Sequence, residues 1–163
     1  RTVFKENGTV TAGNSSPVND GASAVILATK DYAEKNGIPY LAELVDSTEV
    51  GIDPAIMGVS PIEAIKKLIN RSELELSDID LFEINEAFAA SSLAVNRELG
   101  LNESQVNIYG GAIALGHAIG SSGSKILTTL SYALKREQKR YGIASLCIGG
   151  GLGLAVLLKN PNL

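Results

Sequence analysis

The sequence is poor in the residues that hold metals, disulfides and stacked bases. Its 163 residues include one Cys, one His and no Trp. The single cysteine, Cys147, excludes an intrachain disulfide framework, and one His beside one Cys leaves too few ligands for a structural zinc site. Aromatic residues make up only 5% of the chain, so platforms for stacking nucleic-acid bases are not expected. We therefore expect no metal ion and no nucleic-acid partner.

Long apolar runs and a net positive charge are missing too. No apolar run reaches the roughly 18 residues of a membrane span, and the N-terminal residues lack the apolar centre of a signal peptide. The formal net charge of −4 gives little attraction for nucleic-acid phosphates. The one basic run, KREQKR at 135–140, is typical of a helix end, where cations complement the helix dipole. We expect a cytoplasmic protein without a membrane partner. Because the chain begins at Arg1 rather than Met, we also expect it to be part of a longer protein.

Apolar runs and helical patterns alternate along the chain and predict the α/β class. Strands are expected at 22–28, 40–50, 81–84, 143–148 and 152–159. Helices are expected at 29–37, from Ser60 onward, at 87–99, and from Ser121 or Ser122 to about Tyr141, with Gly142 ending the last one. The glycines at 149–151 form a connection short enough for an antiparallel hairpin. The sequence therefore predicts a mixed sheet flanked by helices.

Capping residues mark the ends of several expected helices. Ser60, Pro61 and Glu63 match the S-x-x-E pattern of an N-terminal capping box with proline in the first turn. Gly37 and Gly100 follow two helical segments, at the position where a left-handed C-cap favours glycine.

Two short segments place reactive or polar side chains where α/β proteins bind ligands. Cys147 ends an apolar strand before three glycines. It is either an ordinary buried thiol or a thiol beside free backbone N–H groups, which stabilise a thiolate or an oxyanion. NEAF at 85–88 places Asn85 and Glu86 between a strand and a helix. Asn85 either caps that helix or faces a ligand at the strand end.

A third segment, GGAIALGHAIGSSG at 110–123, surrounds the only histidine, His117, with five glycines. It is either a structural turn with a hydrogen-bonded histidine, or a loop that lets backbone and imidazole approach a substrate closely. Neither common nucleotide motif is present. The G-x-x-x-x-G-K-[ST] pattern fails because Lys125 follows Ser124, and no G-x-G-x-x-G follows the first strand.

Taken together and in this order, these segments resemble the thiolase family of acyl-CoA C-acyltransferases. The matching segments, spread over nearly the whole chain, are GTVTAGNSSPVNDGA, MGVSP, NEAFAA, GGAIALGHAIGSSG and CIGGGLG. The resemblance implies a thiolase-like layered fold, with 1–40 as the end of the N-terminal domain and its linking loop and 41–163 as the C-terminal domain. It also implies that an acyl-cysteine carries either the condensation of two acetyl-CoA to acetoacetyl-CoA or the thiolysis of 3-ketoacyl-CoA.

Four residues match catalytic positions of the family. Cys147 corresponds to the acid/base cysteine, and the backbone N–H of Gly149 to a donor in one oxyanion hole. His117 corresponds to the histidine that helps activate the nucleophile and, with a water held by Asn85, supports the other oxyanion hole. Claisen chemistry needs these parts, because it requires a thiolate, a base for the α-proton and donors for the thioester oxygen.

The resemblance also implies a channel for coenzyme A, which carries the substrate; no covalently bound cofactor is expected. Ser16 corresponds to a serine that touches the pantetheine arm. Met57, Ala87 and Phe88 correspond to apolar residues that line the same channel.

The family's acylated cysteine lies in the half that precedes this segment, and Cys147 belongs to a different motif. The isolated chain is therefore expected to lack thiolase activity. Its expected partners are acyl-CoA, the missing N-terminal thiolase domain and further copies of itself in a dimer or tetramer. The alternative is a catalytically silent thiolase-fold module that provides an interaction surface. A ketoacyl synthase is disfavoured by the cysteine of CIGGG.

Three positions depart from the family pattern. Ala118 stands where proline usually follows the histidine, Tyr109 stands where asparagine is common, and Pro17 stands where glycine is common. Proline would fix φ at about −65°, so Ala118 is expected to leave the histidine loop less constrained. None of the three changes removes a functional group.

Overall fold

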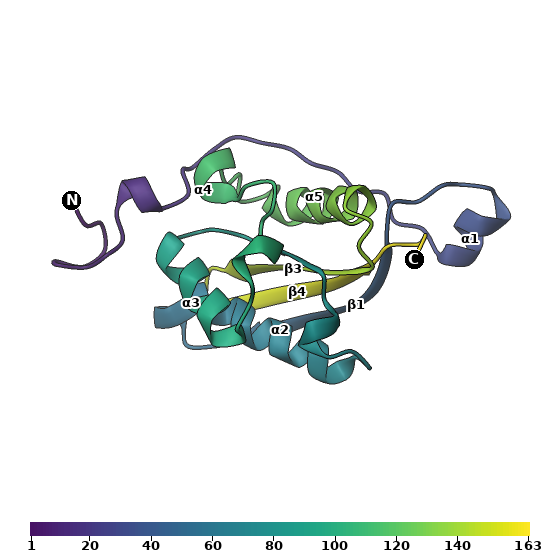
Figure 1. Cartoon of the computed structure of the whole chain (residues 1–163). Coiled ribbons are helices and arrows are strands. Elements are labelled where there is room, and N and C mark those ends of the chain that lie inside the picture. The colour runs from purple at the N-terminus through teal and green to yellow at the C-terminus, as the bar shows by residue number, and fades with distance from the viewer.

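The computed structural model describes residues 1–163 and is built on one four-stranded sheet with the order β1-β4-β3-β2 (Figure 1). β4 (Leu152–Lys159) pairs antiparallel with both β1 (Glu43–Gly51) and β3 (Tyr141–Ile148). The edge strand β2 (Leu81–Ile84) runs parallel to β3. The predicted mixed sheet and the hairpin across 149–151 are therefore confirmed.

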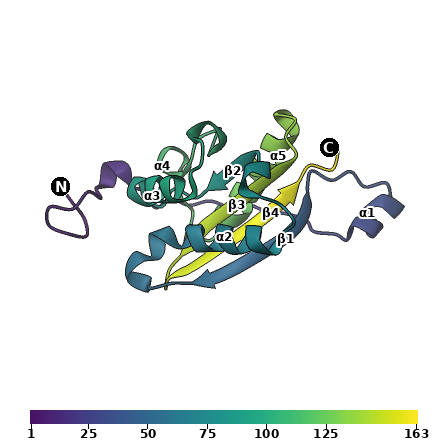
Figure 2. The ribbon, with the colours of Figure 1, turned by 60° about the horizontal axis from the view of Figure 1, so that its bottom comes forward.

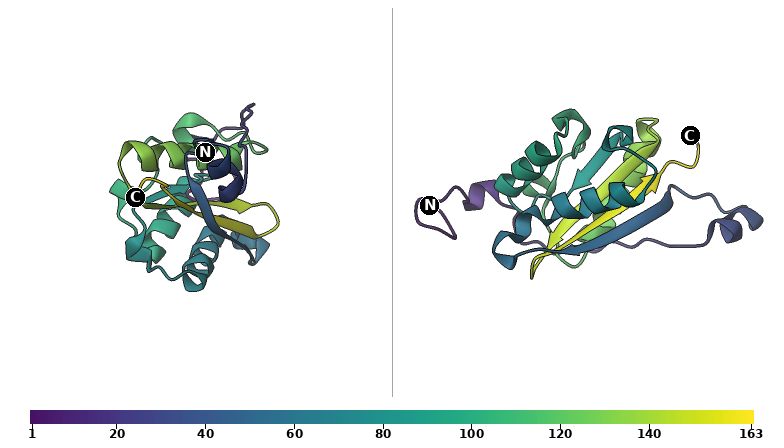
Figure 3. Two further views of the ribbon diagram at one scale, coloured as in Figure 1. Left: turned by 90° about the vertical axis from the view of Figure 1, so that its right-hand side faces the viewer. Right: turned by 90° about the horizontal axis from the view of Figure 1, so that it is seen from below.

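Helices cover both faces of this sheet. The helix α5 packs on one face, and α2 and α3 lie on the other, as the views along and across the sheet show (Figures 1 and 3). The helices are α1 (Lys30–Lys35), α2 (Ser60–Arg71), α3 (Ala89–Leu99), α4 (Ala112–Leu115) and α5 (Ser122–Arg136). A 3₁₀ segment, η2 (Pro54–Val59), leads into α2. The predicted α/β class is confirmed.

The sheet separates two apolar clusters because its side chains alternate between the faces. Ile143 and Leu157 belong to the cluster under α2 and α3, whereas their neighbours Ala144 and Val156 belong to the cluster under α5. The first cluster is completed by Ile62, Ala64, Ile65, Leu68, Ile79, Phe82, Ile84, Val95 and Ala155, and the second by Leu81, Ile126, Leu130, Ala133, Leu134 and Leu158. The buried apolar residues of α2 therefore face the first of them.

Residues 1–42 form an extended arm, which we call the N-terminal arm, that runs past α4 and α5. Its first residues and α1 project from the body at opposite ends (Figure 2). The strand predicted at 22–28 is wrong: this segment is extended but belongs to no sheet. Ile26 and Leu27 are 96% and 75% exposed. A strand needs a neighbour to satisfy its backbone groups, and no strand of this chain lies beside the segment.

One predicted cap and one predicted helix end are also wrong. α2 begins at Ser60 as predicted, but the serine has helical backbone angles and Val59 is the N-cap. The Ser60 hydroxyl instead donates to the carbonyl oxygen of Leu152 at 2.8 Å. α5 ends at Arg136 rather than near Tyr141, and the chain turns at Gln138, which has a φ of 51°. Gly142 therefore lies inside β3, where an added Cβ would come within 2.7 Å of Leu130.

The glycine C-caps of two helices are confirmed. Gly37 has a φ of 62° one residue beyond Asn36, the C-cap of α1, and Gly100 has a φ of 64° directly after α3. The helix dipole explanation of the basic run holds for its first residues, since Lys135 and Arg136 form the last turn of α5.

Candidate functional site

The carboxyl end of β2 presents Asn85. Its N–H donates to the carbonyl oxygen of Ser145 at 2.9 Å, which extends the pairing of β2 with β3 by one residue. Its side chain is 5% exposed. Asn85 caps no helix, because α3 begins later, with Phe88 as the N-cap. The capping interpretation of Asn85 is therefore wrong, and the ligand-facing interpretation stays a prediction.

At Ile84 the free edge of β2 is satisfied by the side chain of Asn107. The Asn107 Oδ1 accepts from the Ile84 N–H at 2.8 Å, and the Asn107 Nδ2 donates to the Ile84 carbonyl oxygen at 2.9 Å. The amide thus takes the place of a neighbouring strand at the point where the chain delivers Asn85. This contact also fixes the start of the glycine-rich loop to the sheet.

At two positions of the loop at 110–123, neighbouring side chains leave no room for a residue larger than glycine. An added Cβ at Gly111 would lie 2.1 Å from the carboxyl carbon of Glu86. That carboxylate accepts from the N–H of Ile113 at 3.1 Å and from Asn107 at 3.3 Å, so it is held against the loop backbone. Gly116 has a φ of 96°, and an added Cβ there would lie 2.6 Å from Asn19. The loop is therefore packed against its surroundings rather than open.

His117 is held by three polar contacts. Its backbone N–H donates to the Asn19 side chain at 3.2 Å, its Nδ1 lies 2.6 Å from the Ser122 Oγ, and its Nε2 lies 3.5 Å from the Asn85 Nδ2. Partial burial lowers the pKa of the imidazole, and the Lys125 charge lowers that pKa further. The structure therefore places a neutral imidazole beside Asn85.

The loosening expected from Ala118 is not seen. Its carbonyl oxygen accepts from the N–H groups of Ser121 and Ser122, each at 2.9 Å, and it also lies 2.9 Å from the Ser122 hydroxyl. These contacts fix the turn after the histidine without a proline.

Cys147 lies near the carboxyl end of β3, the strand that runs parallel to β2. It is the penultimate residue of β3, two residues beyond the Ser145 that pairs with the end of β2. Burial raises the pKa of its thiol, so the thiol holds its proton at neutral pH. Its sulfur makes no hydrogen bond to Asn85 or His117. Gly149 follows in the exposed hairpin turn, with no atom within 4 Å of the position where a Cβ would stand.

Three of the residues assigned to coenzyme A lie together. The Ser16 N–H and hydroxyl both donate to the Ala87 carbonyl oxygen, at 3.0 and 3.2 Å. Phe88 forms an isolated bridge with the residue before Ser16, and its ring meets the edge of Phe4 at 5.5 Å between centroids. Met57 is half-buried in η2, which packs against α3. The N-terminal arm thus contacts the strand-to-helix turn that carries Asn85.

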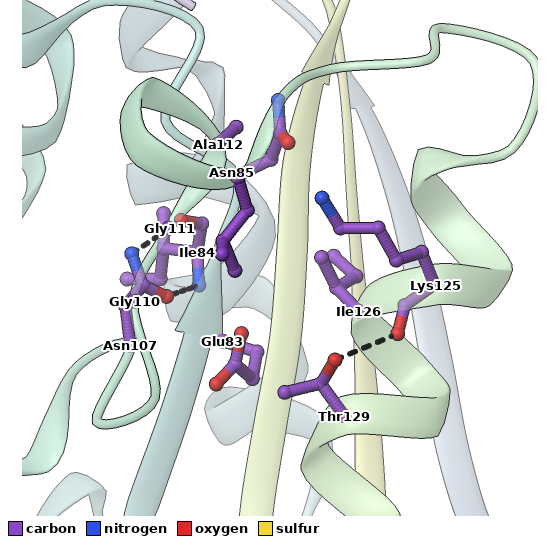
Figure 4. Close-up of a pocket in the computed structure, with 11 residues that line it drawn as sticks. Glu83, Ile84, Asn85, Asn107, Gly110, Gly111, Ala112, Lys125, Ile126 and Thr129 are labelled. Atoms are coloured by element: carbon purple, nitrogen blue, oxygen red, sulfur yellow. Dashed lines mark hydrogen bonds between the residues drawn. The ribbon is translucent and has the colours of Figure 1, made fainter. Parts of the chain in front are cut away.

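A small cavity next to Asn85 is lined by two ionisable side chains that the motifs did not indicate, Glu83 and Lys125 (Figure 4). Its volume is about 10 Å³, and its walls come from β2, the loop at 107–115 and α5. Glu83 is 4% exposed, and burial, with the nearby Glu86 charge, raises its pKa to about 7. Lys125 extends toward Asn85 in Figure 4, and its Nζ donates to the Gly116 carbonyl oxygen at 2.8 Å. Strand alternation indicates Glu83, which lies two residues before Asn85, whereas no sequence signal indicates the role of Lys125.

No group of three or more His, Cys, Asp or Glu side chains is arranged to hold a metal ion. No helix has both the length and the apolar character to span a bilayer.

Comparison with known proteins agrees with this geometry. Residues 38–160 match the model of the thiolase C-terminal domain, and residues 1–31 match that of the thiolase N-terminal domain. An acetyl-CoA acetyltransferase of Paracoccus denitrificans is 48% identical over 161 residues, which are 99% of this chain and 41% of that protein. A probable acetyl-CoA acyltransferase of Staphylococcus aureus is 52% identical over 158 residues, which are 97% of this chain and 40% of that protein.

Solved structures give the same result. The crystal structure of human mitochondrial 3-ketoacyl-CoA thiolase matches with a TM-score of 0.95 and 49% identity, over 98% of this chain and 41% of that one. A structure of the same human enzyme in complex with CoA matches with a TM-score of 0.94 and 49% identity, over 98% of this chain and 40% of that one. The chain thus spans about 40% of the length of these relatives. The chain belongs to the thiolase family.

Proposed function

We propose that this chain is the C-terminal part of an acyl-CoA C-acyltransferase. The whole protein would condense two acetyl-CoA to acetoacetyl-CoA or thiolyse 3-ketoacyl-CoA through an acyl-cysteine. The observation that carries the proposal is the meeting of His117 and Asn85, with 3.5 Å between Nε2 and Nδ2, at the carboxyl end of β2, beside the parallel strand β3 that ends near Cys147. A base, an amide donor and a thiol are the parts that Claisen chemistry requires.

The local environments suit the proposed roles. A thiol whose pKa is raised by burial keeps its proton at neutral pH, so Cys147 can give that proton to a leaving thiolate. The Cys147 thiolate formed in that step is then the base that takes the proton from the α-carbon. An imidazole whose pKa is lowered stays neutral, so His117 can accept the proton of the nucleophilic thiol. Gly149 lies in the exposed hairpin turn with no atom within 4 Å of its Cβ position, so the turn leaves room for a substrate beside the backbone of this oxyanion donor.

We propose that Ser16, Met57, Ala87 and Phe88 line the channel for the pantetheine arm of coenzyme A. The double hydrogen bond from Ser16 to Ala87 supports a shared wall, because it joins the N-terminal arm to the turn after β2. The human relative has been crystallised with CoA.

The acylated cysteine of the proposed reaction lies outside this chain, whose only cysteine ends β3. We propose that residues 1–40 are the end of the N-terminal domain and its linking loop, and that residues 41–163 are the C-terminal domain. The exposure of Ile26 and Leu27 supports a partner domain that covers them. The isolated chain is then inactive. Assembly of the whole protein as a dimer or tetramer stays a prediction.

Complementation tests this proposal. The 163-residue chain is mixed with the separately produced N-terminal thiolase domain, and CoA-dependent cleavage of acetoacetyl-CoA is measured. We expect activity only in the mixture, lost on His117→Ala and on Cys147→Ala but retained on Ser131→Ala, which lies on α5 away from the site. Binding of the two parts without turnover would favour the silent interaction module instead. Turnover by the 163-residue chain alone, lost on Cys147→Ala, would contradict the assignment of the nucleophile.

A further inference from the structure

The side chain of Ser122 lies between the imidazole of His117 and a backbone carbonyl. Ser122 is the first residue of α5 and is 0% exposed. Its Oγ lies 2.6 Å from the His117 Nδ1 and 2.9 Å from the carbonyl oxygen of Ala118. A hydroxyl has one proton to donate and two lone pairs that accept, so these two contacts constrain each other.

The carbonyl oxygen can only accept. Two oxygens 2.9 Å apart attract when a proton lies between them and repel when none does, so the Ser122 proton belongs on the Ala118 side. The Oγ must then accept from the imidazole, which places the ring proton of His117 on Nδ1. The other end of the ring agrees, because the Asn85 Nδ2 is a donor that faces Nε2 at 3.5 Å.

We propose that Ser122 is a positioning residue that holds His117 as the Nδ1–H tautomer, with the lone pair of Nε2 exposed beside Asn85. The catalytic role of this contact rests on the proposed function. In that reaction the S–H bond of the nucleophilic cysteine, which lies outside this chain, breaks. Its proton moves to the His117 Nε2, and the electron pair stays on the sulfur as the thiolate. The ring becomes an imidazolium that keeps its Nδ1–H bond to Ser122 and gains an N–H beside Asn85.

A serine orients the ring without adding charge. A carboxylate in the same place would stabilise the imidazolium and raise the pKa of His117. Here burial lowers the pKa of His117, and the nearby Lys125 cation lowers that pKa further. The base therefore stays unprotonated at neutral pH, with its lone pair fixed on the reactive side.

The tautomer can be read directly, because His117 is the only histidine of the chain. In the ¹⁵N-labelled 163-residue chain, long-range proton–nitrogen correlation spectra distinguish the protonated from the unprotonated ring nitrogen. At pH 8 we expect a protonated Nδ1 and an unprotonated Nε2. In Ser122→Ala the Nδ1–H loses its acceptor, and we expect the Nε2–H tautomer to become populated. Ser122→Thr keeps the hydroxyl and should restore the wild-type signals.

Ser131→Ala is the matched control. Ser131 is buried in α5 and bonds the Leu127 carbonyl oxygen four residues earlier at 2.8 Å, as Ser122 bonds Ala118, but it does not touch the imidazole. Its removal should leave the His117 signals unchanged. An Nε2–H tautomer in the wild-type chain overturns the proposal even if Ser122→Ala does not fold. Unchanged imidazole signals in a folded Ser122→Ala chain overturn it as well.

The complemented enzyme separates this inference from the proposed function. If the mixture is active, Ser122→Ala should lower kcat by about tenfold with little change in KM, less than the loss of about 100-fold or more expected without the imidazole. An inactive mixture with an Nδ1–H histidine contradicts the proposed function and leaves the Ser122 contact intact. An active mixture with an Nε2–H histidine supports the proposed function and contradicts the role of Ser122.

Discussion

The Nζ of Lys125 lies 2.8 Å from the carbonyl oxygen of Gly116, the residue that precedes His117. A side chain from the first turn of α5 thus anchors the loop that carries the imidazole. The same ammonium lowers the pKa of His117 by repelling the charged form of the ring. One residue therefore acts on both the position and the basicity of the histidine.

Lys125→Met should raise the pKa of His117, because the variant removes a cation that opposes protonation while the burial of the ring remains. The pH titration of the imidazole signals in NMR spectra measures the change. Lys67→Met is the matched control, since the Lys67 Nζ also donates to a backbone carbonyl oxygen, that of Glu49, on an exposed surface. A lower His117 midpoint in Lys125→Met would contradict the electrostatic role of Lys125.

Glu83 should make the chain less stable as the pH rises. Its pKa is about 7 in the folded chain against an ordinary 4.5, so the folded state holds a proton that the unfolded state releases. Between these two pH values each increase in pH favours the unfolded state, and above pH 7 the effect is complete. Over this pH range the free energy of unfolding falls by about 3 kcal/mol.

Glu83→Gln should remove this pH dependence, because the amide stays neutral throughout. Urea unfolding at pH 5 and pH 8 gives the free energies, and the variant should gain stability over the wild type at pH 8. The exposed Glu103→Gln is the control and should follow the wild type at both pH values. Equal stability of the wild type at pH 5 and pH 8 would show that the buried carboxyl is not protonated in the folded chain.

Gly111→Ala should destabilise the chain by about 1–3 kcal/mol, the range for overpacking a close contact. The added Cβ would stand 2.1 Å from the Glu86 carboxyl carbon, and moving that carboxylate breaks its bond to the Ile113 N–H. Gly120→Ala in the same loop is the control, because no atom lies within 4 Å of its Cβ position and its φ is not positive. Thermal unfolding followed by circular dichroism compares the two, and similar losses would contradict the steric reason.

Cys147 should react slowly with iodoacetamide at neutral pH. Burial raises the pKa of its thiol, so the reactive thiolate is scarcer than in an exposed cysteine. The rate should rise when the pH is increased and also when urea unfolds the chain at constant pH. Because the chain has one cysteine, mass spectrometry counts the reaction directly. Equal rates in the folded and unfolded chain would contradict a protected thiol.

Local sequence patterns predicted the elements whose ends are determined by their own turn and capping residues. The left-handed glycines at Gly37 and Gly100 were predictable because glycine is the residue that most readily adopts a positive φ at a helix end. The strand at 81–84 and the last hairpin were predictable because each is bounded by turn residues. The strand at 22–28 failed because strand formation depends on a neighbour, and the apolar residues of that segment have none in this chain.

The site was predictable only where residue type and motif coincide. His117 and Asn85 were indicated by their motifs, and the structure places them 3.5 Å apart. Ser122 and Lys125 act through contacts that depend on how α5 meets the loop, which no spacing in the sequence specifies. Ser60 shows that a pattern can also mislead, since a capping pattern was present but tertiary packing made its hydroxyl a donor to the Leu152 carbonyl oxygen.

The N-terminal arm behaves as a mechanical tether on the imidazole. Val18 bridges to His117, the Asn19 side chain holds the His117 N–H at 3.2 Å, and Ser23 contacts the Ser121 carbonyl oxygen at 2.8 Å. The histidine therefore cannot shift without either breaking these bonds or dragging the arm along. A displacement of residues 18–23 therefore reaches the backbone of His117 and the residue before α5 directly. The position of this part of the arm and the position of the histidine are coupled in this fold.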